Sequence, residues 1–242
     1  MSLLTISQAI SDETKGARVS SIINNADPAA QNHLRIITKA GNWMMKSYGW
    51  QLLRKEHAFT APGVETLLAV GAVPADFDRF VPETFWDRAS NNLISGPVGA
   101  VEWQGLKVQQ FSSQNKKFAY RGGAVLTQPI LDSGAACAFE YIAKRWIDIA
   151  ATGTPKAAFT LDTDIGIIDE ELLIYAGAFE YLDAEGQPAA RIAKQLLDYY
   201  NLLVDNEVAE GGATAVADIF ALNARHFEGS PKASRASYGG DF

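Results

Sequence analysis

Cysteine and long apolar runs are scarce in this chain of 242 residues. The single cysteine, Cys137, leaves no internal disulfide and no thiolate metal cluster to form. No stretch approaches the roughly 18 consecutive apolar residues that a membrane helix needs. The first residues have no basic start, and they reach Asp12 and Glu13 too early for a secretory signal. We therefore expect a soluble protein that is made in a cytoplasm and has no membrane among its partners.

Histidine is also rare, and it stands outside any catalytic pattern. The three histidines, His33, His57 and His226, lie far apart, and none has a partner at metal-ligand spacing. The chain has no HExxH or CxxC motif, no phosphate-binding glycine-rich loop and no G-x-S-x-G elbow. Since histidine is the usual base of a nucleophilic triad, this scarcity argues against such an enzyme.

The acidic residues between Asp162 and Glu171 offer the best candidate for a metal site. A calcium loop that starts at Asp162 needs glycine and glutamate where the chain has Ile167 and Leu173, so the pattern fails. We predict instead a turn at 162–164 and acids that cap and charge the start of a helix. The sequence thus predicts no metal and no cofactor. A glycosidase pair, for example Glu140 with Asp148, stays open, because two such carboxylates need only be near in space.

The formal net charge of −7 bears on nucleic-acid binding. Broad binding to DNA or RNA needs a clustered positive surface, which an acidic chain does not favour. An acidic channel wall, in contrast, repels phosphates and lets DNA pass without trapping it.

Helical patterns stand at both ends of the chain. Helices are predicted over 2–14, from Asp27-Pro28 to about Gly49, from about Ile168, and from Gln187-Pro188, with a weaker one over 214–226. Between Trp50 and Ile149, short β-prone runs alternate with turns, such as a hairpin at Gly122-Gly123, a pair joined near Ser90-Asn91 and a short helix near 98–106.

These patterns predict an α+β fold. Residues 1–49 and 160–227 are expected to form a helical bundle, residues 50–159 a β-rich insertion, and residues 228–242 an extended C-terminal tail. Helical spacing selects six residues for the core of the bundle: Leu34, Ile37, Leu172, Phe179, Leu196 and Leu203. Of the five tryptophans, Trp86 and Trp103 lie in less regular segments and are the better interface candidates.

The segment VPADFDRFVPETFWDR, Val73 to Arg88, resembles a signature of tailed-bacteriophage head-to-tail adaptor (connector) proteins, the tail tubular protein A-like or head completion family. Other segments of the family pattern follow in the same order, and the resemblance covers Ser2 to Asp205. They are 48–53, 96–107, the hairpin FAYRGGAVLTQP at 118–129, 138–146 and 159–182. These are packing and turn patterns, and the family carries no catalytic residues to transfer.

The resemblance implies a structural protein of the virion neck, made in the bacterial cytoplasm. It would form a homo-oligomeric ring, commonly a dodecamer, that joins the portal protein to a tail nozzle or tail tube protein and continues the DNA channel. Tail fibres are a further candidate partner, and genomic DNA would pass without sequence-specific binding. The C-terminal tail and the residue before it supply five candidates for the portal interface: Phe227, Lys232, Arg235, Tyr238 and Phe242. The alternative is a tail-associated glycan hydrolase or a glycan-binding virion module, which the tryptophans favour.

Overall fold

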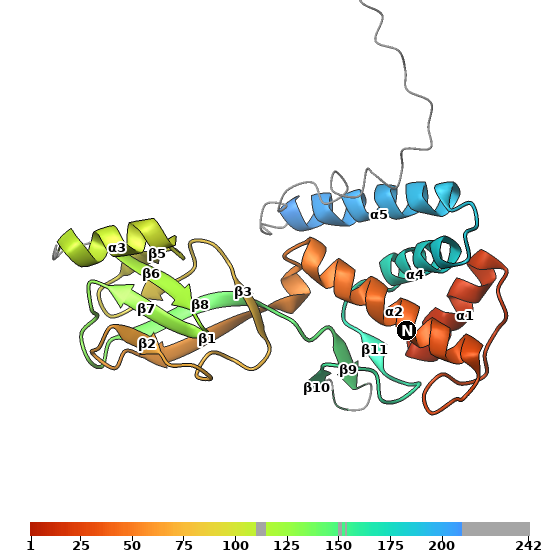
Figure 1. Ribbon diagram of the computed structural model, residues 1–242, viewed down its shortest axis with the longest axis horizontal. Coiled ribbons are helices and arrows are strands. Elements are labelled where there is room, and N and C mark those ends of the chain that lie inside the picture. The colour runs from red at the N-terminus through yellow and green to blue at the C-terminus, as the bar shows by residue number, and fades with distance from the viewer. Residues whose placement is uncertain (110–114, 150–151, 153, 210–242) are drawn as a thin grey trace, which may run out of the picture.

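A computed structural model of the chain describes residues 1–109, 115–149, 152 and 154–209. Figure 1 shows two lobes joined by a narrow neck. The helical lobe comprises the described residues of 1–53 and 144–209, and the β lobe comprises those of 54–143. Each lobe has a hydrophobic core. Within the described residues, no helix is both long and apolar enough to cross a membrane.

The helical lobe contains α1 (Leu3–Thr14), α2 (Pro28–Ser47), α4 (Glu170–Ala184) and α5 (Ala190–Ala209). The predicted start of α2 is confirmed, because the Asp27 carboxylate accepts from the Ala29 amide at 2.9 Å and Pro28 opens the helix. The acids before α4 act as predicted too, since Asp169 caps the helix by accepting from the Leu172 amide at 3.0 Å.

The core of the helical lobe lies between these four helices (Figure 1). Of the six predicted core residues, Ile37, Leu172 and Leu196 are buried. The other three, Leu34, Phe179 and Leu203, are half-buried and pack against the same core.

The β lobe is built around one mixed sheet of eight strands. The strands run in the order β1-β8-β4-β5-β6-β7-β2, and β3 pairs with β8 beside this path. All pairs are antiparallel except β5 with β6. Helix α3 (Ala100–Gln109) lies along one side of the lobe in Figure 1. The strand bounds are β1 Arg54–Thr60, β2 Thr66–Leu68, β3 Phe77–Phe80, β4 Trp86–Asp87, β5 Asn92–Ser95, β6 Lys116–Arg121, β7 Ala124–Gln128 and β8 Ala136–Ala143.

The fold class expected from the sequence, a helical bundle with a β-rich insertion, is wrong. The described residues form five α-helices and a mixed eight-stranded sheet, and this sheet, which curls around its own aromatic-rich core, dominates the architecture. A second sheet of β9 (Ile147–Ile149), β10 (Thr154–Lys156) and β11 (Ile165–Gly166) lies with the helices. The extent of the sheet is hard to predict from the sequence, because many of its strands are short and residues distant in the chain pair to form it.

The local turn predictions are confirmed. Gly122 and Gly123, with φ of 55° and 84°, join β6 to β7, a geometry that favours glycine. Trp86 pairs with Leu93 across the predicted turn, where Asn91 has φ of 54°. The short helix expected near 98–106 is α3. The weaker helix predicted over 214–226 and the tail over 228–242 lie outside the described residues.

Candidate functional site

The segment that carries the adaptor resemblance, Val73–Arg88, crosses the junction of the two lobes. Its strands β3 and β4 both pair with β8. Strand β8 leads through Trp146 into the helical lobe, where that ring packs against α2. A Cβ at Gly41 would lie 2.1 Å from the Trp146 ring, so only glycine allows this approach. The segment therefore lies where one lobe is held to the other.

Arg79, on β3, attaches the β lobe directly to the end of α2. Its Nη2 donates to the carbonyl oxygen of Tyr48 at 2.6 Å and, more weakly, to that of Met45 at 3.4 Å. Its Nη1 pairs with Asp78 at 2.7 Å. The last carbonyls of a helix lack partners within the helix and carry partial negative charge, so a guanidinium suits this position.

Asp76 lies immediately before β3 and bonds to side chains on two other strands, β1 and β8. Its carboxylate accepts from Lys55 Nζ at 2.7 Å and from the Tyr141 hydroxyl at 3.0 Å. Burial alone would raise the pKa of Asp76, but the hydrogen bonds from Lys55 and Tyr141 outweigh it and hold the pKa below its usual range. Burial and the Asp76 hydrogen bond raise the pKa of Tyr141 to about 12. Asp76 thus stays charged and Tyr141 stays protonated at neutral pH.

Asp87, near the end of the segment, organises the β4–β5 turn. It is buried, pairs with Lys116, and accepts from the Ser90 hydroxyl at 2.6 Å and from the Ala89 amide at 3.0 Å. Burial opposes the charge, while Lys116 and Ser90 favour it, and the net result is a lowered pKa for Asp87. Three acids of the segment and Arg79 are therefore engaged in internal contacts, the acids being Asp76, Asp78 and Asp87.

The two tryptophans predicted as interface residues have different surroundings. Trp86 is 43% exposed on the outer face of the sheet, between Ala138 and Leu93 on the neighbouring strands. Trp103 is only 2% exposed, and the cations of Lys107 and Arg121 lie 5.7 Å and 5.6 Å from its ring centroid. The structure therefore keeps Trp86 as an interface candidate and corrects Trp103 to a packing residue.

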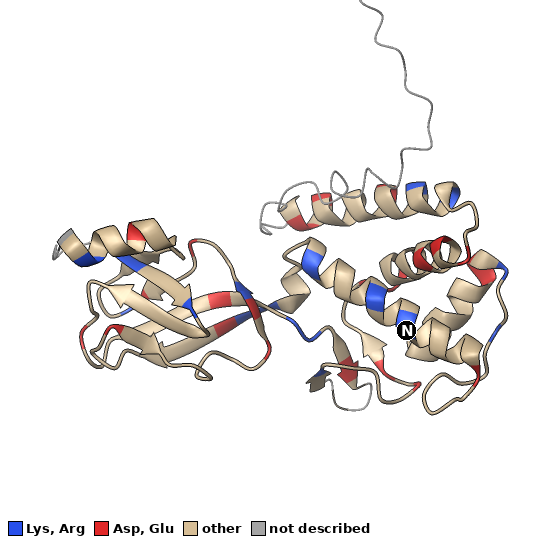
Figure 2. Cartoon of the chain, in the orientation of Figure 1, with Lys and Arg blue, Asp and Glu red and all other residues tan. Residues whose placement is uncertain are grey.

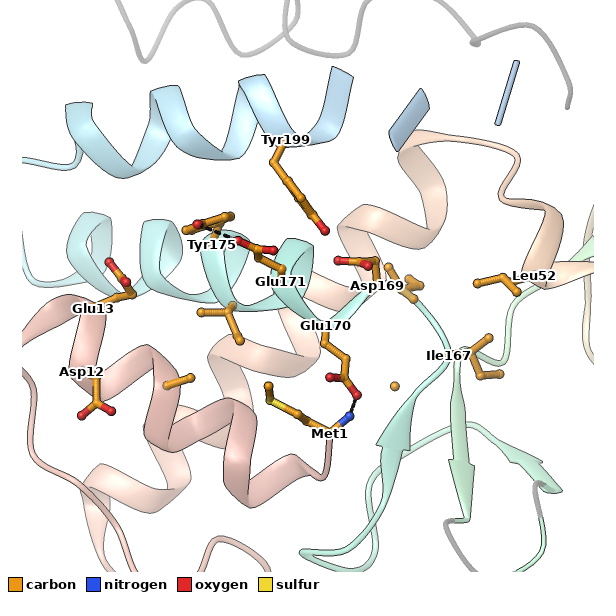
Figure 3. Close-up of a pocket in the computed structure, with 14 residues that line it drawn as sticks. Met1, Asp12, Glu13, Leu52, Ile167, Asp169, Glu170, Glu171, Tyr175 and Tyr199 are labelled. Carbon is orange, nitrogen blue, oxygen red and sulfur yellow. Dashed lines mark hydrogen bonds and ion pairs between the residues drawn. The ribbon is translucent and has the colours of Figure 1, made fainter. Parts of the chain in front are cut away.

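A wide cleft of about 840 Å³ opens between α1, α4 and α5 (Figure 3). Two tyrosines, Tyr175 and Tyr199, line it together with five acids, namely Asp12, Glu13, Asp169, Glu170 and Glu171. Glu171 accepts from the Tyr175 hydroxyl at 2.9 Å, and Glu170 pairs with the amino group of Met1. Burial, followed by the charges of Asp169 and Glu171, raises the pKa of Tyr199 to about 12.

The other acids of this cleft, which we call the acidic cleft, also have internal partners. Asp12 pairs with Arg18, Glu13 lies 3.2 Å from Arg191, and Asp169 caps α4. The hydrogen bond from Arg18 lowers the pKa of Asp12. The cleft is thus acidic, but its carboxylates are held in structural roles.

The carboxylates considered for a glycosidase pair belong to different sheets. Glu140 lies on β8, opposite Glu56 on β1 and 3.8 Å from the Arg54 guanidinium. Asp148 lies on β9, where its Oδ1 is buried without a hydrogen bond and burial raises its pKa.

A buried serine–histidine contact was not anticipated. Ser7 Oγ and His33 Nδ1 share a hydrogen bond of 3.0 Å, and burial lowers the pKa of His33. Both side chains are buried, so the hydroxyl is closed to a substrate. The one available signal was that each stands at a core position of its helix. His57 packs between Phe59 and Phe139, with its pKa also lowered by burial, and His226 lies outside the described residues.

The predicted turn at 162–164 is present, and its two aspartates bond to residues before α2 and around β10. Asp162 accepts from the Ile23 amide at 2.8 Å and from the Ile22 amide at 3.1 Å. Asp164 is buried, accepts from the Leu161 amide at 2.8 Å and pairs with Lys156. In the part of the chain that the structure describes, no three histidine, cysteine or acidic side chains are grouped to hold a metal ion.

The geometry of the junction does not by itself name a family. A comparison of the chain with known protein-family models gives no match. A comparison with curated protein sequences gives no match either. The adaptor resemblance therefore rests on the motifs of the chain, and the function that it implies is a proposal.

Proposed function

We propose that this protein is the structural adaptor of a tailed-bacteriophage neck. It forms a ring, with twelve copies as the expected number, that joins the portal to the tail and continues the DNA channel. One observation carries the proposal: segments of the resemblance that are distant in sequence contact one another. Asp76 and Arg79 of the signature bind Tyr141 of the 138–146 segment and Tyr48 of the 48–53 segment.

These contacts give the signature a physical meaning. In the proposed ring, a fixed angle between the two lobes would let every subunit present the same surfaces to its neighbours, as closure requires. Arg79 on the helix carbonyls holds the β lobe to α2, and Trp146 against Gly41 anchors the chain where it enters the helical lobe after β8.

The charge of the chain suits a channel that DNA passes through. The formal net charge is −7, and acidic side chains line the cleft of the helical lobe. Figure 2 shows lysine and arginine scattered over both lobes and not gathered on one of them. We propose that the wall facing the DNA is acidic or neutral, so that phosphates are not retained.

The proposed partners are further copies of the chain, the portal protein and a tail nozzle or tail tube protein, with tail fibres as an additional candidate. Trp86 is the aromatic residue that we assign to such a contact, because a partner would bury its exposed ring. The portal candidates Phe227, Lys232, Arg235, Tyr238 and Phe242 lie outside the described residues and stay predictions.

The ring is tested by measuring the mass of the purified protein in solution, alone and mixed with the portal protein of the same genome. Electron micrographs of the mixture should show a ring of adaptor density under the portal. Trp86→Ala should reduce ring formation, whereas the control Ile130→Ala, at another exposed apolar residue of the β lobe, should not. A protein that stays monomeric under both conditions would contradict the proposal.

The alternative, a glycan hydrolase or glycan-binding module of the virion, is favoured by the acidic cleft with its two tyrosines. We place it second because those carboxylates already cap, pair or bond within the chain. Release of sugar from host glycan by purified protein, abolished by Glu171→Gln, would reverse this order.

A further inference from the structure

A narrow apolar groove lies next to the acidic cleft, where the short helix η1 (Gln51–Leu53) meets α5. It encloses about 280 Å³, and Trp50, Leu52, Ile168 and Leu203 form its apolar lining. Leu52 lines both hollows, as Figure 3 shows at the edge of the acidic cleft, and it is 66% exposed. Leu52 therefore presents an apolar side chain to solvent directly beside the apolar lining of the groove.

The chain itself leads to this groove. Asn206 and Glu207, near the end of α5, form its polar rim. The Glu207 carboxylate accepts from the Gln51 amide at 2.9 Å, and Gln51 Nε2 donates to the Glu207 carbonyl at 3.2 Å. The end of α5 is therefore fixed to η1, and the described part of the chain ends beside the groove.

The residues that follow have the composition to fill it. After Ala209 come 242 − 209 = 33 residues, and the large aliphatic side chains among them gather in the run Val216 to Leu222. Val216 lies seven positions after Ala209, a distance along the chain that can span about 23 Å. Gly211-Gly212 lies within that span, and glycine restricts the path of the backbone least.

Charge is compatible with the same arrangement. The segment 214–226 carries one acid, Asp218, and one arginine, Arg225, so it adds no net negative charge beside Asp169, which lines both the groove and the acidic cleft. We propose that residues 214–226 dock into this groove of their own chain, with Ile219 and Phe220 against Trp50 and Leu52. This inference is independent of the adaptor function.

A disulfide tests the contact in the full-length chain. Leu52→Cys is combined with Phe220→Cys, and Cys137 is replaced by alanine because it is the single natural cysteine. On mild oxidation the pair should form an intrachain disulfide at least about ten times faster than the control pair Leu52→Cys with Ser237→Cys, since a disulfide requires close approach of the two Cα atoms. A rate equal to that of the control overturns the proposal. So does a disulfide between two chains, which would assign the groove to a neighbouring copy.

Hydrogen exchange provides a second test without cysteines. The amides of Gln51 and Leu53 donate to Glu207 and to the Trp50 carbonyl, so they report on the groove. Ile219→Asp with Phe220→Asp should speed exchange at these amides at least about tenfold, and the control Tyr238→Asp should leave it unchanged. Unchanged exchange in the double variant would refute docking on this groove, whatever the ring measurements show.

Discussion

Replacing Arg79 with alanine should weaken the junction of the lobes by a predictable amount. The variant loses a charged hydrogen bond of 2.6 Å to the Tyr48 carbonyl and leaves the end of α2 without its cation. A hydrogen bond to a charged group contributes about 1.5–3 kcal/mol, and a cation at a helix end contributes about 0.3–1 kcal/mol. The Arg79 side chain is 31% exposed, so solvent screening reduces both. We expect the free energy of unfolding to fall by about 2 kcal/mol.

The measurement is urea unfolding followed by circular dichroism, supported by a melting temperature about 4–8 °C lower. Two variants serve as controls. Arg79→Lys keeps the charge but not the forked geometry, and it should lie between the alanine variant and the parent. Arg88→Ala breaks an exposed pair with Glu56 and should cost under about 1 kcal/mol. A loss for Arg79→Ala no larger than that for Arg88→Ala would refute the reasoning.

Three further predictions concern the neck, its acid sensitivity and the tail. Gly41→Ala places a methyl group against the Trp146 ring and should cost about 1–3 kcal/mol or more in thermal unfolding, whereas Gly105→Ala, in open space on α3, should be neutral or stabilising. Asp76 has a lowered pKa in the folded state, so its charged form stabilises the fold above the unfolded pKa of about 3.9, and this stabilisation is lost as pH falls through the folded pKa. In urea unfolding, the difference in free energy of unfolding between the parent and Asp76→Asn should therefore shrink below about pH 4. Deleting residues 228–242 should leave the circular dichroism spectrum intact but weaken binding to the portal and yield heads that lose DNA; unchanged portal affinity would contradict a docking role for the tail.

Local chemistry made much of the secondary structure predictable. Asp27 and Asp169 each stand one residue before a helix, and their carboxylates accept amide hydrogen bonds there. Gly122 and Gly123 adopt the positive φ angles of a tight hairpin. Such signals lie within a few residues of the structure that they specify, so one sequence is enough to read them.

The sheet could not be predicted in the same way, because its pairing is not local. Arg54 of β1 lies opposite Ile142 of β8, and no residue near either one specifies that register. The candidate site shows the same limit. Val73–Arg88 was recognisable as a segment, but the partners of Asp76 and Arg79 lie 65 and 31 residues away along the chain. Trp103 was expected at an interface because its helix is short and irregular in pattern, and two cations that converge on its ring from α3 and β6 keep it covered.

The attachment made by Arg79 has a consequence for how such a chain can change over evolutionary time. The guanidinium binds main-chain carbonyls of residues 45 and 48, and every amino acid supplies a carbonyl. Substitutions at Met45 and Tyr48 are therefore limited by packing in the core and not by the hydrogen bonds from Arg79. Selection to keep these hydrogen bonds acts on the side chain of Arg79 alone. The helical lobe is free to diversify towards new binding surfaces, while a single arginine codon preserves the angle at which that lobe is presented.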